Sequence, residues 1–300
     1  MSATGRAWIL WALLSAASFA VMGGCVRVAS EALPQSEVVF FRNFLALLFL
    51  MPLLWNQGVS LRTDVFGLHL ARSGLGLTAM YLYFYALVHL PLASAMLLNY
   101  TSPLFIAVIA VLWLKERWTR PRIMALLLGF AGVLLLFNPG SEVASLAGLL
   151  GLASGAFAGL ALATVKKLSA SEPAVRIVTW FALLSSLISA VPMLFEFRWP
   201  TAELWAWLAA VGLFANLGQL GLTIAYSKAA ATQVSPLSYS SLIFAGIVGF
   251  LAWGELPDTL GLFGTILVAL AGIMVARERS EPLPVPPSTV PAVNPQESKL

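Results

Sequence analysis

Two arginines stand inside long apolar stretches of this chain. Arg42 lies in the stretch 38–55 and Arg72 in the stretch 66–88. A guanidinium group is costly to bury in an apolar environment, so it needs a partner, a hydrated cavity or a path to the surface along its aliphatic stem. Its planar fork of donors matches a carboxylate or a phosphate better than an amine. We predict that both arginines bind an anionic group; the alternative is that either one reaches an aqueous interface.

Three tyrosines follow Arg72 in the same stretch, at alternate positions. On a helix, Arg72 and Tyr83 share one face because they are eleven residues apart, whereas Tyr81 and Tyr85 lie on roughly the opposite face. Both faces cannot line one pore. We therefore favour the face of Arg72 and Tyr83 as the lining, and expect the other face to pack against neighbouring helices or to lie at an interface.

The stretch 204–226 carries four polar residues at helical spacing. Asn216, Gln219, Thr223 and Tyr226 are separated by three, four and three positions, so they form one continuous stripe. Lipid does not tolerate such a stripe. We predict that Asn216 and Gln219 face a binding cavity, and the alternative is that the stripe forms hydrogen bonds between helices.

Two further stretches combine polar residues with proline near their middle. Asn99 and Tyr100 precede Pro103, and Tyr239 follows Pro236. Proline leaves backbone carbonyl groups unpaired inside a helix, and such broken segments point to a binding site at the middle of a membrane. We predict that Asn99, Tyr100 and Tyr239 line this site, with a simple packing kink as the alternative.

One tryptophan and several acidic residues complete the candidates. Trp180 could stack on an aromatic or cationic substrate, although the membrane interface is the commoner place for tryptophan. No Asp or Glu lies in the middle of an apolar stretch, so a proton carrier is not evident; Glu37 is the nearest carboxylate and could pair with Arg42. Glu116 and Glu255 lie beside turns, which favours a capping role over a role in transport.

The elements that must position these residues are membrane-spanning helices. The chain is 60% hydrophobic and only 10% charged, with a mean hydropathy of +0.89, far from the composition of a soluble domain. A window of about 20 residues, the length of a spanning helix, identifies ten spans. They are approximately 8–28, 38–55, 66–88, 93–114, 122–137, 146–165, 175–195, 204–226, 234–253 and 259–276.

The spans fall into two similar sets of five. The segment from Asn99 to Glu116 reappears from Ser238 to Glu255, with Tyr100 and Tyr239 in register 139 positions apart. An odd number of spans per copy makes the second copy enter the membrane from the opposite face. The predicted fold is therefore an all-α membrane protein with ten helices in two inverted repeats around a central cavity.

The distribution of positive charge agrees with this inversion, because Lys and Arg favour cytoplasmic loops. Equivalent loops of the two copies differ in charge, as expected if they face opposite sides. Lys115, Arg117, Arg120 and Arg122 follow the fourth span, whereas their counterparts are Gly254, Leu256, Thr259 and Gly261. Both termini are predicted to be cytoplasmic. This loop bias also accounts for the net charge of +4, so nucleic acid is not an expected partner.

The resulting division places the first repeat at 1–139 and the second at 140–280. Residues 281–300 are rich in proline and polar residues, a composition that cannot bury enough apolar surface to fold. We predict a disordered cytoplasmic tail there.

The repeats resemble those of the EamA type within the drug/metabolite transporter superfamily. Residues 93–117 and 129–134 carry the likeness in the first copy, and residues 231–233, 253–255 and 270–273 carry it in the second. The resemblance implies ten helices around a central cavity and, usually, export of small metabolites. It says little about the substrate, because members handle amino acids, sugars, nucleotides and drugs.

The expected function is transport rather than catalysis. The sequence contains no H-E-x-x-H, no G-x-S-x-G and no Cys/His cluster, so we expect neither an enzyme nor a bound metal or cofactor. We predict an exporter in the bacterial inner membrane, as a monomer or homodimer, for a zwitterionic or carboxylate-bearing metabolite such as an amino acid or an opine-type metallophore. The alternative is a flippase for a lipid-linked or phosphate-bearing substrate.

Overall fold

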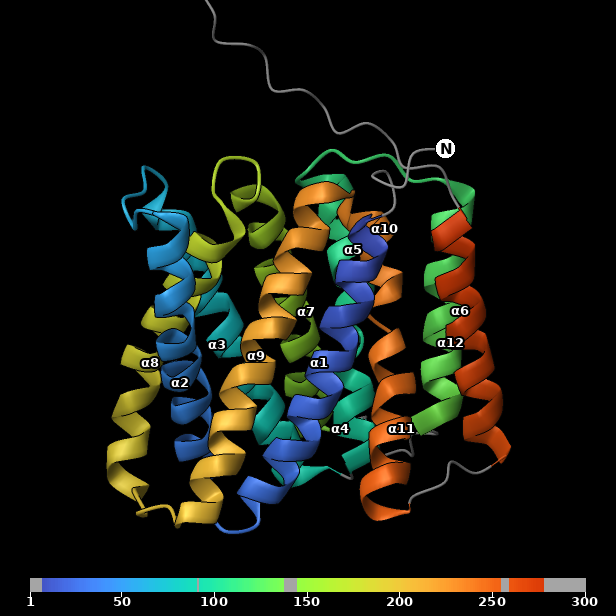
Figure 1. The fold of residues 1–300 in the computed structure, drawn as a ribbon. Helices are drawn as coiled ribbons and strands as arrows, with labels where there is room; N and C mark the ends of the chain where they lie inside the picture. The colour runs from blue at the N-terminus through green and yellow to red at the C-terminus, as the bar shows by residue number, and fades with distance from the viewer. Residues whose placement is uncertain (1–6, 91, 138–144, 255–258, 278–300) are drawn as a thin grey trace, which may run out of the picture.

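All regular secondary structure in the described part of the chain is α-helical. The structure, a computed structural model, describes residues 7–90, 92–137, 145–254 and 259–277. Figure 1 shows the helices side by side as one bundle. Their bounds are α1 Ala7–Ser30, α2 Gln35–Gln57, α3 Phe66–His89, α4 Leu92–Asn99, α5 Ser102–Leu112, α6 Arg120–Phe137, α7 Leu146–Leu168, α8 Ala174–Glu196, α9 Ala202–Lys228, α10 Ala231–Leu237, α11 Ser240–Trp253 and α12 Thr259–Arg277.

Each predicted span corresponds to one helix or to a pair of consecutive short helices. Within the described residues, eight segments are long and apolar enough to cross a membrane, which makes this a multi-pass membrane protein. They are α1, α2, α4–α5 from Ala95, α7, α8, α9, α10–α11 and α12. The helices outside this set are α3, which carries Arg72, and α6, which begins with Arg120.

The fourth and ninth spans are interrupted near their middles. Helix α4 ends at Asn99 and α5 begins at Ser102, while α10 ends at Leu237 and α11 begins at Ser240. Proline lacks an amide hydrogen, so it removes one donor of the helical ladder near each interruption. A side-chain hydroxyl group forms a hydrogen bond with a backbone carbonyl group there: Ser240 Oγ donates to the Leu237 carbonyl oxygen over 2.6 Å. The predicted breaks are therefore present.

The bundle is built from closely packed helix pairs. Helix α1 packs against α9 and α3 against α7, while α2 packs against α8 and α6 against α12; the α1–α9 and α6–α12 pairs are visible in Figure 1. Small residues allow the close approach. A Cβ atom on Gly155 of α7 would lie 2.8 Å from the Leu98 carbonyl oxygen, and one on Gly159 would lie 2.9 Å from the Ile106 amide nitrogen.

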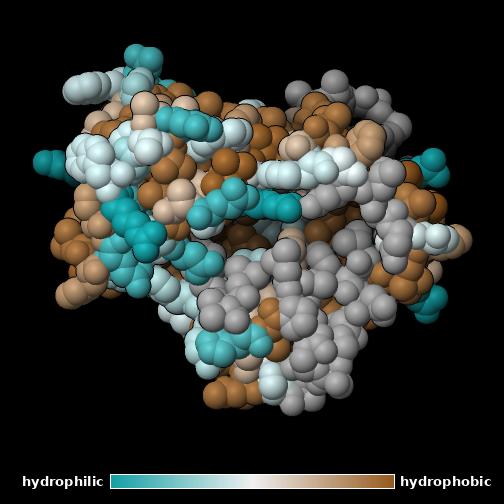
Figure 2. All heavy atoms as spheres, turned by 90° about the horizontal axis from the view of Figure 1, so that it is seen from below, coloured by the Kyte–Doolittle hydropathy of each residue, from teal (hydrophilic) through white to brown (hydrophobic). Residues whose placement is uncertain are grey.

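The two ends of the bundle differ. We call the N-side the end that holds the start of α1 and the segments 58–65, 113–119 and 169–173, and the far side the opposite end, with segments 31–34 and 197–201. Figure 2 shows the far side, which is hollowed near its centre, with hydrophilic residues beside the hollow. A cleft of about 710 Å³ lies on this side and is lined by residues 30–35 and 195–198.

Candidate functional site

Arg72 is held inside the bundle by three helices. It extends from α3, is 5% exposed, and donates through Nη2 to Gln219 Oε1 of α9 over 3.2 Å. Its guanidinium carbon lies 4.0 Å from the centre of the Phe181 ring of α8, a cation–π contact. Arg72 therefore does not reach an aqueous interface. No sequence pattern indicates Phe181 as its neighbour, because Phe181 is one of many apolar residues in α8.

The hydrogen-bond partners of Arg42 within the described segments are neutral groups. From α2 it donates through Nη1 to Asn43 Oδ1 over 3.0 Å, and its Nε lies 3.5 Å from the Met22 sulfur of α1. Arg42 therefore lies between α1 and α2, whereas Arg72 lies among α3, α8 and α9.

The predicted pair between Glu37 and Arg42 is wrong. Glu37 is fully buried at the far-side end of α2, where its Oε2 accepts a hydrogen bond from the Arg198 backbone amide over 3.0 Å. The two side chains lie five residues apart on α2, so they do not share a face. The loop before α9 supplies the partner instead, and no periodicity within α2 indicates that contact.

The tyrosines of α3 separate as predicted. Tyr81 and Tyr85 are 37% and 39% exposed, and Tyr85 stacks on His89 at the surface with ring centres 4.1 Å apart. Tyr83 is half-buried and packs against an apolar cluster that includes Ala95 and Ala147. The face of Arg72 and Tyr83 therefore points into the bundle.

The residues at the helix interruptions join the two halves of the chain. Asn99 Nδ2 donates to Ser154 Oγ of α7 over 3.3 Å. The Tyr100 hydroxyl lies 3.1 Å from Ser241 Oγ, within hydrogen-bond distance. These contacts place Asn99 and Tyr100 in the interior, next to the equivalent interruption between α10 and α11.

Asn216 and Tyr239 occupy packed positions in this conformation. Asn216 is 5% exposed, and its Nδ2 donates to the Ala46 carbonyl oxygen of α2 over 2.7 Å. This is the interhelical hydrogen bond that the sequence left open as an alternative. Tyr239 is fully buried in an apolar cluster that includes Leu97 and Val268. Both side chains therefore take part in packing between helices.

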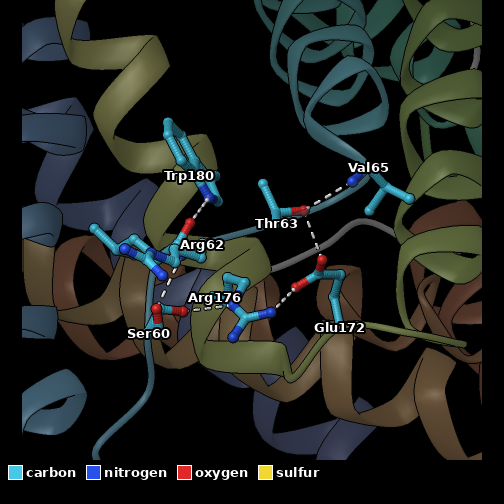
Figure 3. A network of polar contacts seen from close by, with 8 residues as sticks. Ser60, Arg62, Thr63, Val65, Glu172, Arg176 and Trp180 are labelled. Atoms are coloured by element: carbon cyan, nitrogen blue, oxygen red, sulfur yellow. Dashed lines mark hydrogen bonds and ion pairs between the residues drawn. The ribbon is translucent and has the colours of Figure 1, made fainter.

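Trp180 lies at the N-side and contacts the loop before α3. Its Nε1 donates to the Leu61 carbonyl oxygen over 3.2 Å, and its ring meets Phe66 edge to face with centres 5.1 Å apart. Figure 3 shows its position beside the loop before α3. The structure therefore places Trp180 in an anchoring contact between a loop and α8.

The same loop is fastened by a polar network that the sequence did not indicate. Glu172 accepts a hydrogen bond from Thr63 Oγ1 over 2.6 Å and forms an ion pair with Arg176 over 2.6 Å (Figure 3). Arg176 in turn donates through Nε to the Ser60 carbonyl oxygen over 2.6 Å. These contacts attach segment 58–65 to the start of α8 and hold the two segments close together at the N-side.

A second N-side contact connects the first half of the chain to α10. Glu116 accepts hydrogen bonds from the backbone amides of Ala231 and Thr232 over 2.7 and 2.9 Å, and from Thr232 Oγ1 over 3.0 Å. The carboxylate therefore caps the first turn of α10, as predicted for Glu116. Glu255, its counterpart, lies outside the described residues.

Lys166 binds the C-terminal end of α9, the helix before α10. Its Nζ donates to the carbonyl oxygens of Tyr226 and Ala229 over 2.7 and 2.6 Å, at the end of α9. A cation is favourable there because the last carbonyl groups of a helix lack partners within the helix. Glu116 and Lys166 together hold the turn between α9 and α10 at the N-side.

Membrane-spanning helices with polar side chains in their interior are typical of membrane transport proteins, and comparison with known proteins identifies the family. The model of the EamA-like transporter family matches residues 6–138 and again residues 145–277. The chain therefore belongs to the EamA-like transporter family, within the drug/metabolite transporter superfamily. It is a transporter and not an enzyme.

Several relatives are named for the compound that they transport. The chain is 34% identical to the pseudopaline exporter CntI of Pseudomonas aeruginosa over 276 residues, which cover 91% of this chain and 97% of that protein. It is 29% identical to a riboflavin transporter of Vibrio cholerae over 87% of this chain and 90% of the relative. An S-adenosylmethionine uptake transporter of Rickettsia felis is 27% identical over 91% and 92%.

A solved crystal structure shares the fold. It superimposes with a TM-score of 0.78 at 18% identity and covers 91% of this chain and 96% of the other. At this identity the likeness concerns the architecture alone.

Proposed function

We propose that the protein exports a small zwitterionic or carboxylate-bearing metabolite across the bacterial inner membrane. An amino acid or an amino-acid-derived compound, such as an opine-type metallophore, fits this class. The observation that carries the proposal is that Arg72 is buried and Arg42 is partly buried, and that their hydrogen-bond partners among the described residues are neutral. The relative named a pseudopaline exporter, which aligns along 91% of this chain, supports the same class of substrate.

The transport unit in this proposal is ten helices in two inverted repeats, 1–139 and 140–280. The packing supports it, because α1 with α9 and α7 with α3 are equivalent pairs under exchange of the halves. Exchange of the halves converts the pair of α2 and α8 into itself, and it does the same for the pair of α6 and α12. An inverted arrangement with the N-terminus in the cytoplasm also explains why Lys and Arg concentrate in the N-side loops.

We assign the substrate site to residues of α2, α3, α9 and the interrupted helices. Arg42, Arg72 and Gln219 bind the anionic part of the substrate, while Tyr83 and the interrupted segment with Asn99 and Tyr100 form the wall. Asn216, Tyr239 and Trp180 support this site through the contacts described above. Their side chains meet neighbouring helices or loops rather than the substrate.

The proposed mechanism is alternating access between the two ends. The N-side is fastened by Glu116 at the start of α10 and by the loop network around Glu172, whereas the far side is hollowed (Figure 2). This conformation is therefore the one that releases substrate to the far side. Export requires the N-side contacts to open while the far side closes around the substrate.

The test is untargeted mass spectrometry of cells and culture medium from a deletion strain and from strains complemented with wild-type protein or variants. We expect a carboxylate-bearing compound to accumulate inside the deletion strain and to disappear from its medium. Wild-type protein and the loop variant Arg62→Ala should restore export, whereas Arg42→Ala and Arg72→Ala should not. Depletion from the cells would indicate uptake instead, and a change confined to the lipid extract would indicate a flippase.

A further inference from the structure

A histidine lies buried on the same helix as Arg72. His69 of α3 is 1% exposed, and neither of its ring nitrogens has a hydrogen-bond partner in the part of the chain that the structure describes. It precedes Arg72 by three residues, so both side chains lie on one face of α3. A neutral imidazole has one N–H donor and one acceptor nitrogen, and it is costly to bury both without partners. A hydrogen-bonding role within this conformation therefore does not explain His69.

The His69 ring lies against the side chain that anchors the N-side loop. Its centre is 5.9 Å from the centre of the Trp180 ring of α8. Trp180 in turn donates its Nε1 hydrogen to the Leu61 carbonyl oxygen, and it follows Arg176 by one helical turn. A charge on His69 would therefore act at the point where segment 58–65 is attached to α8 (Figure 3).

The charged groups that face His69 belong to the same N-side network. Glu172 and Arg176 form an ion pair over 2.6 Å, and they act on the imidazole with opposite signs. Other charged side chains of the neighbouring segments contact other groups or solvent; they are Arg62, Asp64, Lys166 and Lys167. Helix α4, which also packs against α3, carries no titratable side chain. Glu172 is therefore the carboxylate that a positive charge on His69 would attract.

An imidazolium ion is unfavourable in the closed N-side. Protonation gives the His69 ring two N–H donors, and neither nitrogen faces an acceptor among the described residues. A buried charge without a partner costs far more than a buried neutral ring. The imidazolium would also compete with Arg176 for Glu172, which weakens the attachment of segment 58–65, and opening of that segment admits water to the ring. Proton binding and opening of the N-side therefore favour each other.

We propose that His69 is a proton-binding site of this transporter and that it binds one proton when the N-side opens. The neutral imidazole belongs to the conformation described above, and the imidazolium belongs to the conformation with the N-side open. This inference rests on the proposed function, and it adds the ion, a proton, that controls the end of the transporter where the substrate enters.

The experiment measures the ratio of open to closed N-side at different pH values by double electron–electron resonance. Spin labels are attached to the full-length protein in lipid nanodiscs through Arg62→Cys and Lys228→Cys, two exposed N-side positions. The single cysteine, Cys25, is replaced by alanine. The distance between the labels distinguishes the two conformations, and the populations are obtained without a chemical reaction whose own rate depends on pH.

The expected change follows from the ordinary titration of an imidazole in water, which has a pKa of about 6.5. A hydrated ring is about 90% protonated at pH 5.5 and almost entirely neutral at pH 8. Because the open N-side binds the proton and the closed N-side does not, we expect the ratio of open to closed to rise roughly 10-fold from pH 8 to pH 5.5. Its slope should approach one decade per pH unit at the acid end, as binding of one proton requires.

Variants of the two histidines assign the proton to its residue. His69→Gln should keep the ratio within about 2-fold over the same pH range, since glutamine does not titrate. His89, the other histidine, is exposed at the opposite end of α3, so His89→Gln should retain the roughly 10-fold rise. His89→Gln also leaves His69 as the one imidazole of the chain. Its NMR signal should change from the neutral to the charged form with the same midpoint as the ratio, which tests the site even where His69→Gln does not fold.

Three results would overturn the inference. They are an unchanged ratio in the parent protein, a pH response that survives in His69→Gln, and an imidazole signal in His89→Gln that stays neutral at pH 5.5. Each would leave the proposed function standing, because the mass-spectrometric comparison of deletion and complemented strains does not depend on this ratio. Failure of that comparison would overturn the proposed function and would leave the measured pH response of the N-side unchanged.

Discussion

Replacing Glu116 with glutamine should open the N-side of the transporter. The carboxylate accepts two backbone amides and one hydroxyl at the start of α10. Glutamine keeps one acceptor oxygen and replaces the other with an NH2 group, so a lost hydrogen bond costs about 1 kcal/mol, and loss of the negative charge at a helix N-terminus costs up to about 1 kcal/mol more. A total of about 2 kcal/mol corresponds to a roughly 30-fold shift of the equilibrium toward the open N-side.

Thiol labelling measures this shift. Ser235 lies in α10 and is fully buried, so a Ser235→Cys variant reacts with a maleimide only when the N-side opens. Cys25, the one cysteine of the chain, is replaced by alanine in this background. We expect Glu116→Gln to accelerate labelling about 30-fold, in line with the shift above.

The matched control is Glu196→Gln at the opposite end. Glu196 is exposed on the far side, where its Oε2 accepts from Ser36 Oγ over 2.8 Å, and it does not contact α10. Its replacement should leave labelling of Ser235→Cys unchanged. A labelling rate within about 3-fold of the parent for Glu116→Gln would refute the argument, because a cap that held the N-side closed must alter the opening equilibrium.

Three further substitutions test the packing and the site. Gly155→Leu should prevent stable folding, because a leucine side chain would keep α7 from approaching the Leu98 carbonyl oxygen. The control Gly246→Leu should fold, since open space surrounds that position. Size-exclusion chromatography measures both outcomes. Asn216→Leu should lower stability by about 0.6 to 1.7 kcal/mol and leave substrate affinity unchanged, whereas Gln219→Leu should weaken substrate binding. Tyr100→Phe should lower the thermal midpoint slightly, through loss of a hydrogen bond of about 0.5–1.5 kcal/mol; an unchanged midpoint would assign that bond no role in stability.

The helices could be predicted closely from the sequence, because crossing a membrane is a requirement on each segment separately. A run of about 20 apolar residues must form a helix to satisfy its own backbone groups in lipid. The interruptions near Pro103 and Pro236 follow from the same local rule. Membership of the EamA-like family was likewise predictable, since the repeat is written in the sequence itself.

The hydrogen-bond partners that side chains find on other helices or loops could not be predicted as well from the sequence. The distance from Glu37 to Arg42 along the chain suggested a pair, yet the Arg198 amide is the partner in the folded protein. Asn216 and Gln219 belong to one helical stripe, but one binds the Ala46 carbonyl and the other binds Arg72. Which polar residue supports the fold and which faces the arginines depends on the neighbouring helix.

The sequence by itself determined which segments cross the membrane, where they break, and that two arginines stand among apolar residues. These properties depend on composition and period within one segment, and the cost of exposing polar groups to lipid enforces them locally. Only the tertiary structure decided that Arg72 contacts Gln219 and Phe181 and that Arg42 contacts Asn43 and lies beside Met22. That outcome depends on the rotation and height of each helix, which are set by close packing between segments far apart in the sequence, as at Gly155 and Leu98.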